Sequence, residues 1–186
     1  MVARTRNAGR NTFVSEQVIV FLKRRSLEFT GAVLLICGAT LTLAVCGYDP
    51  TDPSWNHAVA RDANNPLGLP GAWLADIMIQ SIGGGAILPG FILMVWGWRI
   101  FRHREMGRRW LRIIAVPITL VLTVITFAAL DPLAIWPTNI GYGGALGMIL
   151  LDNIKYLTTT ADIPLWPITT VIGIMAIGAM GTTLGI

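Results

Sequence analysis

Residues 72–98 read AWLADIMIQSIGGGAILPGFILMVWGW, which is a long and almost entirely apolar run. Its only charged residue is Asp76, which lies near one end. A helix needs about 20 mostly apolar residues to cross the roughly 30 Å hydrocarbon core of a bilayer. Because an unpaired backbone amide is costly in lipid, a crossing segment of this kind must be helical. The stretch therefore predicts a transmembrane helix.

Three further stretches have the same character, over residues 27–47, 113–130 and 163–186. The first carries only Glu28 at its start, and the other two carry no charged residue. The chain is 54% hydrophobic and 13% charged, with a mean hydropathy of +0.64, whereas soluble domains carry about 25% charged residues. The apolar runs are continuous and lack the alternation of a membrane β-barrel. The sequence therefore predicts an all-α, polytopic membrane helical bundle with four transmembrane helices.

The connections between the spans differ in charge. Segment 1–26 and connection 99–112 hold 12 of the 14 basic residues, whereas connections 48–71 and 131–162 hold only Arg61 and Lys155. Lys and Arg stay on the cytoplasmic side of inner-membrane proteins. We therefore expect a cytoplasmic basic segment 1–26, a four-helix domain over 27–186, an inner loop 99–112, outer loops 48–71 and 131–162, and both termini in the cytoplasm.

Two shorter segments leave alternatives open. Residues 15–25 are amphipathic and fit a helix that either lies on the cytoplasmic face or runs straight into the first span. The apolar stretch that follows is longer than the 7–15 residues of a signal peptide and has no A-x-A site after it, which favours retention of the first span. Residues 141–151 are apolar but too short to cross, so we expect a short helix that lies at the interface or enters the bilayer partway.

A search for catalytic, cofactor and metal sites gives negative predictions for each. A P-loop needs a lysine directly after glycine, but Lys23 follows leucine and Lys155 follows isoleucine. His57 and His103 fall on opposite sides of the membrane in this topology. Cys37 and Cys46 lie about 13 Å apart along one helix at 1.5 Å per residue, which is too far for a disulfide. We expect no cofactor and no direct nucleotide or nucleic-acid binding, because the basic residues are placed as topology signals.

Asp76 supports a different hypothesis, a small multi-pass transporter or channel subunit. A charged group in a span often marks a solute or proton path, and Gln80 lies one turn further along the same helical face. An interfacial residue that bonds to the outer loop is the alternative interpretation of Asp76.

Glycines are abundant and indicate close helix packing. Gly83, Gly84 and Gly85 lie in the middle of the second span, where they and Pro89 also predict a bend. Gly143 and Gly147 form one G-x-x-x-G pair, and Gly181 and Gly185 form another.

The outer loop 48–71 is rich in turn-forming pairs. It contains Asp49-Pro50-Thr51-Asp52-Pro53, then Asn64-Asn65-Pro66 and Pro70-Gly71. Asp-Pro and Asn-Pro pairs favour turns, so we expect a compact, structured loop.

Three strings in the chain resemble a known family. They are YDPTDPSW at 48–55, NPLGLPGAWLAD at 65–76 and GGALG at 143–147. Their order, from about Leu27 to the end of the chain, closely resembles the N-terminal four-helix membrane domain of the FtsK/SpoIIIE DNA translocases. Linker and P-loop motor are absent from this sequence, so either a fragment of a translocase or a stand-alone membrane module fits.

The resemblance implies a role in cell division. Members of the family anchor a hexameric, ATP-driven DNA pump at the septum of the inner membrane and assemble with other division proteins. The resemblance thus implies a septal membrane anchor and assembly module that couples division to chromosome segregation, with a homo-oligomer, a hexamer by analogy, and divisome membrane proteins as partners beside the lipid bilayer. A passive anchor with no partner role is the third hypothesis.

The outer loop supplies the candidate interaction residues under this reading. Folding the loop onto the helix ends is an equal alternative role for them. They are Asp52, Pro53, Ser54, Trp55, Gly71, Ala72, Trp73 and Asp76.

Overall fold

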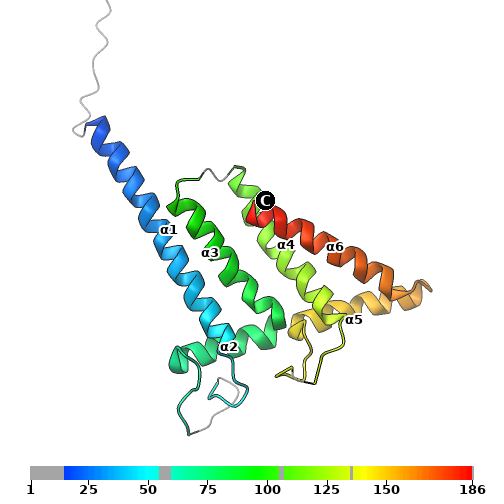
Figure 1. The fold of residues 1–186 in the computed structure, drawn as a ribbon. Coiled ribbons are helices and arrows are strands. Elements are labelled where there is room, and N and C mark those ends of the chain that lie inside the picture. The colour runs from blue at the N-terminus through cyan, green and yellow to red at the C-terminus, as the bar shows by residue number, and fades with distance from the viewer. Residues whose placement is uncertain (1–14, 55–59, 105–106, 135, 186) are drawn as a thin grey trace, which may run out of the picture.

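A computed structural model describes residues 15–54, 60–104, 107–134 and 136–185, which form α-helices and one 3-10 helix and contain no strand (Figure 1). The elements are α1 (Glu16–Cys46), α2 (Gly68–Ile82), η1 (Gly83–Ala86), α3 (Ile87–Phe101), α4 (Arg109–Ala128), α5 (Gly144–Thr160) and α6 (Leu165–Leu184). Within these described ranges, four segments are long and apolar enough to cross a membrane: α1, Gly68–Phe101, α4 and α6. The all-α, four-span prediction is confirmed.

Helix α1 begins well before the apolar stretch. The Ser15 side chain caps it by accepting a hydrogen bond from the Val18 N–H at 3.4 Å. The helix then continues without a break to Cys46, so the amphipathic segment 15–25 runs straight into the first span. Its 31 residues extend about 46 Å at 1.5 Å per residue, which exceeds the hydrocarbon core and leaves the first turns outside it.

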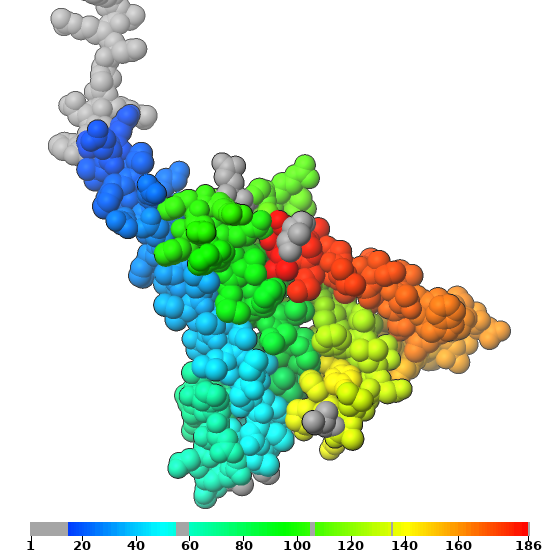
Figure 2. All heavy atoms as spheres, in the orientation of Figure 1, coloured from blue at the N-terminus to red at the C-terminus, as the bar shows by residue number. Residues whose placement is uncertain are grey.

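The helices form two antiparallel pairs, α1 with α3 and α4 with α6 (Figures 1 and 2). Helix α2 runs across one end of the first pair, and α5 lies at the same end beside α4 (Figure 1). We call this the loop end, and we call the opposite end, where α3 connects to α4, the basic end. The start of α1 and the end of α6 both lie toward the basic end (Figure 1).

Four glycines let α1 and α3 approach closely, and we call them the glycine seam: Gly31, Gly38, Gly90 and Gly97. A Cβ on Gly38 would lie 2.6 Å from the Gly90 carbonyl oxygen, and one on Gly97 would lie 2.7 Å from the Leu35 nitrogen. These distances leave no room for any side chain, so backbone packs on backbone. The seam was not predicted from the sequence, although the glycines of each pair are spaced seven residues apart and so share a helical face.

The second apolar stretch is broken where the three consecutive glycines predict a bend. Gly83 has φ +56°, a conformation that only glycine adopts readily. It ends α2, and the 3-10 turn η1 over Gly83–Ala86 then redirects the chain into α3. The 15 residues of α3 span only about 22 Å, which is less than the roughly 30 Å hydrocarbon core.

The short helix predicted at 141–151 is present but longer than predicted. Helix α5 begins at Gly144 and continues to Thr160. The prediction stopped at the first charge, Asp152, because it counted only apolar length. Polar residues do not end a helix outside lipid, and Lys155 lies one turn further on, 3.5 Å from the Asp152 carboxylate.

Donors from α3 cap the C-terminal end of α6, and a threonine of α4 lies beside it. The Trp96 indole N–H donates to the Thr183 carbonyl at 2.8 Å, and the Arg99 guanidinium donates to the carbonyls of Leu184 and Gly185. The Thr119 hydroxyl of α4 lies 2.9 Å from the Thr183 hydroxyl. The last carbonyls of a helix need such donors and attract a cation. This cap therefore joins α3, α4 and α6 at the basic end.

Candidate functional site

The loop end is organised around the buried carboxylate of Asp52, which is only 3% exposed. One carboxylate oxygen accepts hydrogen bonds from the Asn64 N–H at 2.7 Å and from Arg61 at 3.5 Å. The other oxygen accepts from the Asn65 N–H at 3.0 Å. Because both oxygens are engaged from the far side of the loop, Asp52 closes the loop into a compact unit.

Asn65 ties this unit to the helices. Its amide group donates to the carbonyls of Ala44 at 2.8 Å and Gly47 at 3.0 Å, and its side-chain oxygen accepts from the Leu67 N–H at 3.1 Å. The first two bonds satisfy carbonyls at the end of α1, and the third forms the turn that leads into α2. A Cβ on Gly71 would meet the Asn65 side chain, so Gly71 makes room for this arrangement. Asn65 was not among the predicted site residues.

Asp49 lies on the outer side of the same loop. Its carboxylate accepts from the Thr51 hydroxyl at 2.6 Å, the Thr51 N–H at 2.8 Å and the Asn64 amide at 2.9 Å. These hydrogen bonds, the Thr51 hydroxyl first, lower the pKa of Asp49 to about 2. Asp49 is therefore ionised throughout the physiological pH range. Its carboxylate also lies 3.9 Å from the Arg61 guanidinium.

Asp76 connects α2 to the end of α1. It is buried, and one carboxylate oxygen accepts from Gln80 at 2.7 Å and from the Tyr48 hydroxyl at 3.5 Å. The other oxygen has no hydrogen-bond partner. The geometry fits the interpretation of Asp76 as a residue that bonds to the outer loop.

The Tyr48 phenol gives the loop end a pH dependence. Burial, and then the nearby Asp76 carboxylate, raise the pKa of Tyr48 from 10.0 to about 12. Because the folded chain holds this proton more tightly than the unfolded chain, the contribution to stability is complete below about pH 10 and is lost as the pH rises through about 12.

We therefore expect the free energy of unfolding to fall between about pH 10 and 12, and Tyr48→Phe to remove this part of the fall. Chemical denaturation across that range, with phenolate absorbance followed in parallel, measures it. Tyr156→Phe is the matched control, since Tyr156 is 73% exposed. Equal pH profiles for wild type and Tyr48→Phe would contradict the assignment.

The predicted interaction residues divide by burial. Asp52, Pro53, Gly71, Ala72 and Asp76 are buried, Ser54 is half-buried and Trp73 is 39% exposed. Trp55 lies outside the described residues. Buried members shape the loop, so Trp73 and Ser54 are the members that a partner could reach.

The predicted packing glycines meet at the loop end. The Gly84 N–H donates to the Tyr142 carbonyl at 2.8 Å. A Cβ on Gly83 would lie 2.6 Å from the Gly144 nitrogen, and one on Gly144 would lie 2.5 Å from the Gly83 nitrogen. We call this contact the glycine lock. Added Cβ atoms on Gly143 or Gly147 would meet the Val124 carbonyl of α4, and one on Gly85 would meet the Val124 side chain.

The described residues hold no group of three or more His, Cys, Asp or Glu side chains that could bind a metal ion. His103 lies 3.0 Å from Glu28, and His57 is outside the described residues. Cys37 and Cys46 are both free thiols. The loop end is thus built from hydrogen bonds and close backbone packing.

Comparison with known proteins identifies relatives across most of the chain. The family described as the 4TM region of DNA translocase FtsK/SpoIIIE matches residues 23–183. The DNA translocase FtsK of Azospirillum brasilense is 32% identical over 161 residues, which cover 83% of this chain and 26% of that protein. The DNA translocase FtsK of Caulobacter vibrioides is 35% identical over 165 residues, which cover 86% of this chain and 20% of that protein.

A third relative, the DNA translocase FtsK of Bradyrhizobium diazoefficiens, is 30% identical over 162 residues, which cover 87% of this chain and 19% of that protein. The chain therefore spans about a quarter or less of the length of these curated relatives. No solved structure matches the chain. The resemblance in the loop and glycine strings is confirmed: this chain belongs to the family of four-transmembrane-helix regions of the FtsK/SpoIIIE DNA translocases, and it matches the membrane region of these relatives and not their motor domain.

Proposed function

We propose that this chain is the membrane anchor and septum-targeting module of a DNA translocase that couples cell division to chromosome segregation. The family match over residues 23–183 is the observation that carries the proposal. In this role the chain lies in the bacterial inner membrane with both termini in the cytoplasm, where the motor of the translocase acts. Lys23, Arg24 and Arg25 come shortly before Glu28, which lies 3.0 Å from His103 of the α3–α4 connection, and this grouping of basic residues supports that orientation.

The loop end supports an assembly role in addition to anchoring. A passive anchor needs only helices of sufficient length, whereas this chain joins the described parts of its outer loop, 48–54 and 60–67, to each other and to α1 through Asp52 and Asn65. A preorganised loop loses less conformational entropy when a partner binds. We propose division membrane proteins and further copies of this chain, a hexamer by family analogy, as the partners. No bound nucleotide or nucleic acid enters this role.

Asp76 fits this role better than the transport alternative. Its hydrogen bonds come from Gln80 on its own helix and Tyr48 at the end of α1, so the carboxylate fixes α2 against α1. A proton or solute path would need further ionisable groups along the spans.

The test follows a fluorescently tagged chain in dividing Caulobacter vibrioides cells. We expect enrichment at division sites, and a severalfold lower enrichment for Trp73→Ala at equal expression and equal thermal stability. Trp166→Ala is the matched control, because Trp166 is also an exposed tryptophan, at 72%, and lies in the first turn of α6 and not in the outer loop or α2. An even distribution of the wild-type chain around the envelope would contradict the septal role. Equal effects of the two tryptophan variants would contradict the loop as its determinant.

A further inference from the structure

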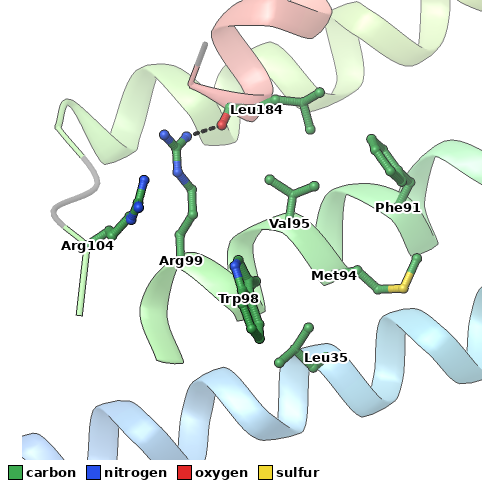
Figure 3. Close-up of a pocket in the computed structure, with 8 residues that line it drawn as sticks. All are labelled: Leu35, Phe91, Met94, Val95, Trp98, Arg99, Arg104 and Leu184. Carbon is green, nitrogen blue, oxygen red and sulfur yellow. Dashed lines mark hydrogen bonds between the residues drawn. The ribbon is translucent and has the colours of Figure 1, made fainter. Parts of the chain in front are cut away.

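A groove at the basic end combines arginines with apolar side chains, and the anchoring role does not use it. Its volume is about 500 Å³, and it lies between α1, α3 and the end of α6 (Figure 3). Arg99 and Arg104 stand at one end of it, and the side chains of Leu35, Phe91, Met94 and Val95 line the rest. We propose that this groove binds one anionic phospholipid of the adjacent leaflet, with its phosphate at Arg104 and one acyl chain along α3.

The dimensions of the groove match one leaflet. Phe91 lies eight residues before Arg99 on α3, which is about 12 Å along the helix axis. Half of the roughly 30 Å hydrocarbon core is about 15 Å. A lipid whose phosphate sits at the arginines therefore places most of an acyl chain against the apolar part of the groove. Trp98, 52% exposed at the same level as Arg99, occupies the interfacial position that tryptophan prefers.

The charges at the head of the groove are complementary to a phosphate. The Arg104 side chain is exposed and has no hydrogen bond or ion pair with the described residues. Arg99 uses both terminal nitrogens on the α6 carbonyls, which leaves its Nε–H without an acceptor among the described residues but holds its charge in place. Arg102 stacks 5.1 Å over the Trp98 ring and adds a third positive charge.

Glu28 of α1, which lies at the basic end, does not neutralise this cluster. Glu28 lies 2.6 Å from Arg25 and 3.0 Å from His103, so its charge is already shared. Basic pockets between helices on the cytoplasmic side of membranes bind anionic headgroups in this way. Since most of the groove wall is apolar, a lipid complements it and a soluble anion leaves most of it unfilled.

The test measures lipid retention by the full chain in detergent. Equal amounts of phosphatidylglycerol and phosphatidylcholine are added, and bound lipid is counted by native mass spectrometry. We expect a preference for phosphatidylglycerol that Arg104→Gln lowers about fivefold, since one basic residue near the surface contributes about that factor. Phe91→Ala should lower retention of both lipids, because it removes acyl-chain contact without changing charge.

Arg108→Gln is the matched control, since it removes one charge from the same connection without touching the groove. We expect it to leave the preference within about twofold of wild type. Equal losses from Arg104→Gln and Arg108→Gln would assign the effect to general surface charge and overturn the proposal. Absence of a preference in the wild-type chain, or displacement of the lipid by excess glycerol phosphate, would also overturn it.

Discussion

A leucine in place of Gly38 is expected to lower the apparent melting temperature of the detergent-solubilised chain by roughly 6–12 °C. Even a Cβ at this position would lie 2.6 Å from the Gly90 carbonyl oxygen and 2.8 Å from the Met94 nitrogen, both backbone atoms that cannot rotate away. The helices must separate to admit the side chain. Overpacking of this kind costs about 3 kcal/mol, which corresponds to the stated shift for a chain of this size.

Lipid makes this effect larger than a similar change in a soluble protein. Lipid tails are as apolar as side chains, so helices in a bilayer associate through close packing and not through apolar burial. Separating α1 from α3 therefore removes most of what holds them together. Thermal unfolding followed by near-ultraviolet circular dichroism measures the shift.

Gly178→Leu is the control for this prediction. Gly178 lies in α6, and a Cβ there would meet no heavy atom within 4 Å. Its substitution should leave the melting temperature within a few degrees of wild type, because leucine has a higher helix propensity than glycine by less than about 1 kcal/mol. Similar losses in both variants would show that added bulk, and not the glycine seam, sets the stability.

Replacement of Asn65 by alanine is expected to open the 48–67 loop. The change leaves the Ala44 and Gly47 carbonyls without the amide donor and the Leu67 N–H without its acceptor. Asn65 is 4% exposed, so water does not replace these bonds while the loop stays closed. Each buried polar group without a partner costs about 1–3 kcal/mol, and we expect a total loss of about 3–5 kcal/mol in the free energy of closing the loop.

Hydrogen exchange of the amides in residues 60–68 measures this opening. We expect their exchange to accelerate by a factor of 100 or more, as about 3 kcal/mol implies, while exchange in α4 and α6 stays unchanged. Asn153→Ala is the control, since that exposed amide donates only to the Ile149 carbonyl of its own helix. If the loop amides exchanged at wild-type rates in Asn65→Ala, Asn65 would not be the residue that ties the loop to α1.

The spans could be predicted from sequence because lipid imposes one dominant rule, the exclusion of charge. The break at Gly83 was also predictable, since consecutive glycines weaken a helix wherever they occur. The same rule placed the end of α5 too early, because Asp152 ends the apolar run but the helix continues to Thr160.

The role of Asn65 was not predictable, because its main partner is the Ala44 carbonyl, a backbone group that any residue would supply. The Asn-Pro pair indicated a turn but not what the turn holds. The glycine seam had a visible signal in the spacing of Gly31 with Gly38 and of Gly90 with Gly97. That signal becomes specific only when two spans are known to be neighbours, which hydropathy does not reveal.

The glycine lock sets an order of events during folding. The bond from the Gly84 N–H to the Tyr142 carbonyl joins groups 58 residues apart, and its geometry exists only after Gly83 has taken its positive φ. Because ordering so long a loop is entropically costly, we expect α5 (Gly144–Thr160) to dock after the α1–α3 pair already holds the bend. A chain arrested before this step would have α1 and α3 paired while the contact between Gly84 and Tyr142 is still open.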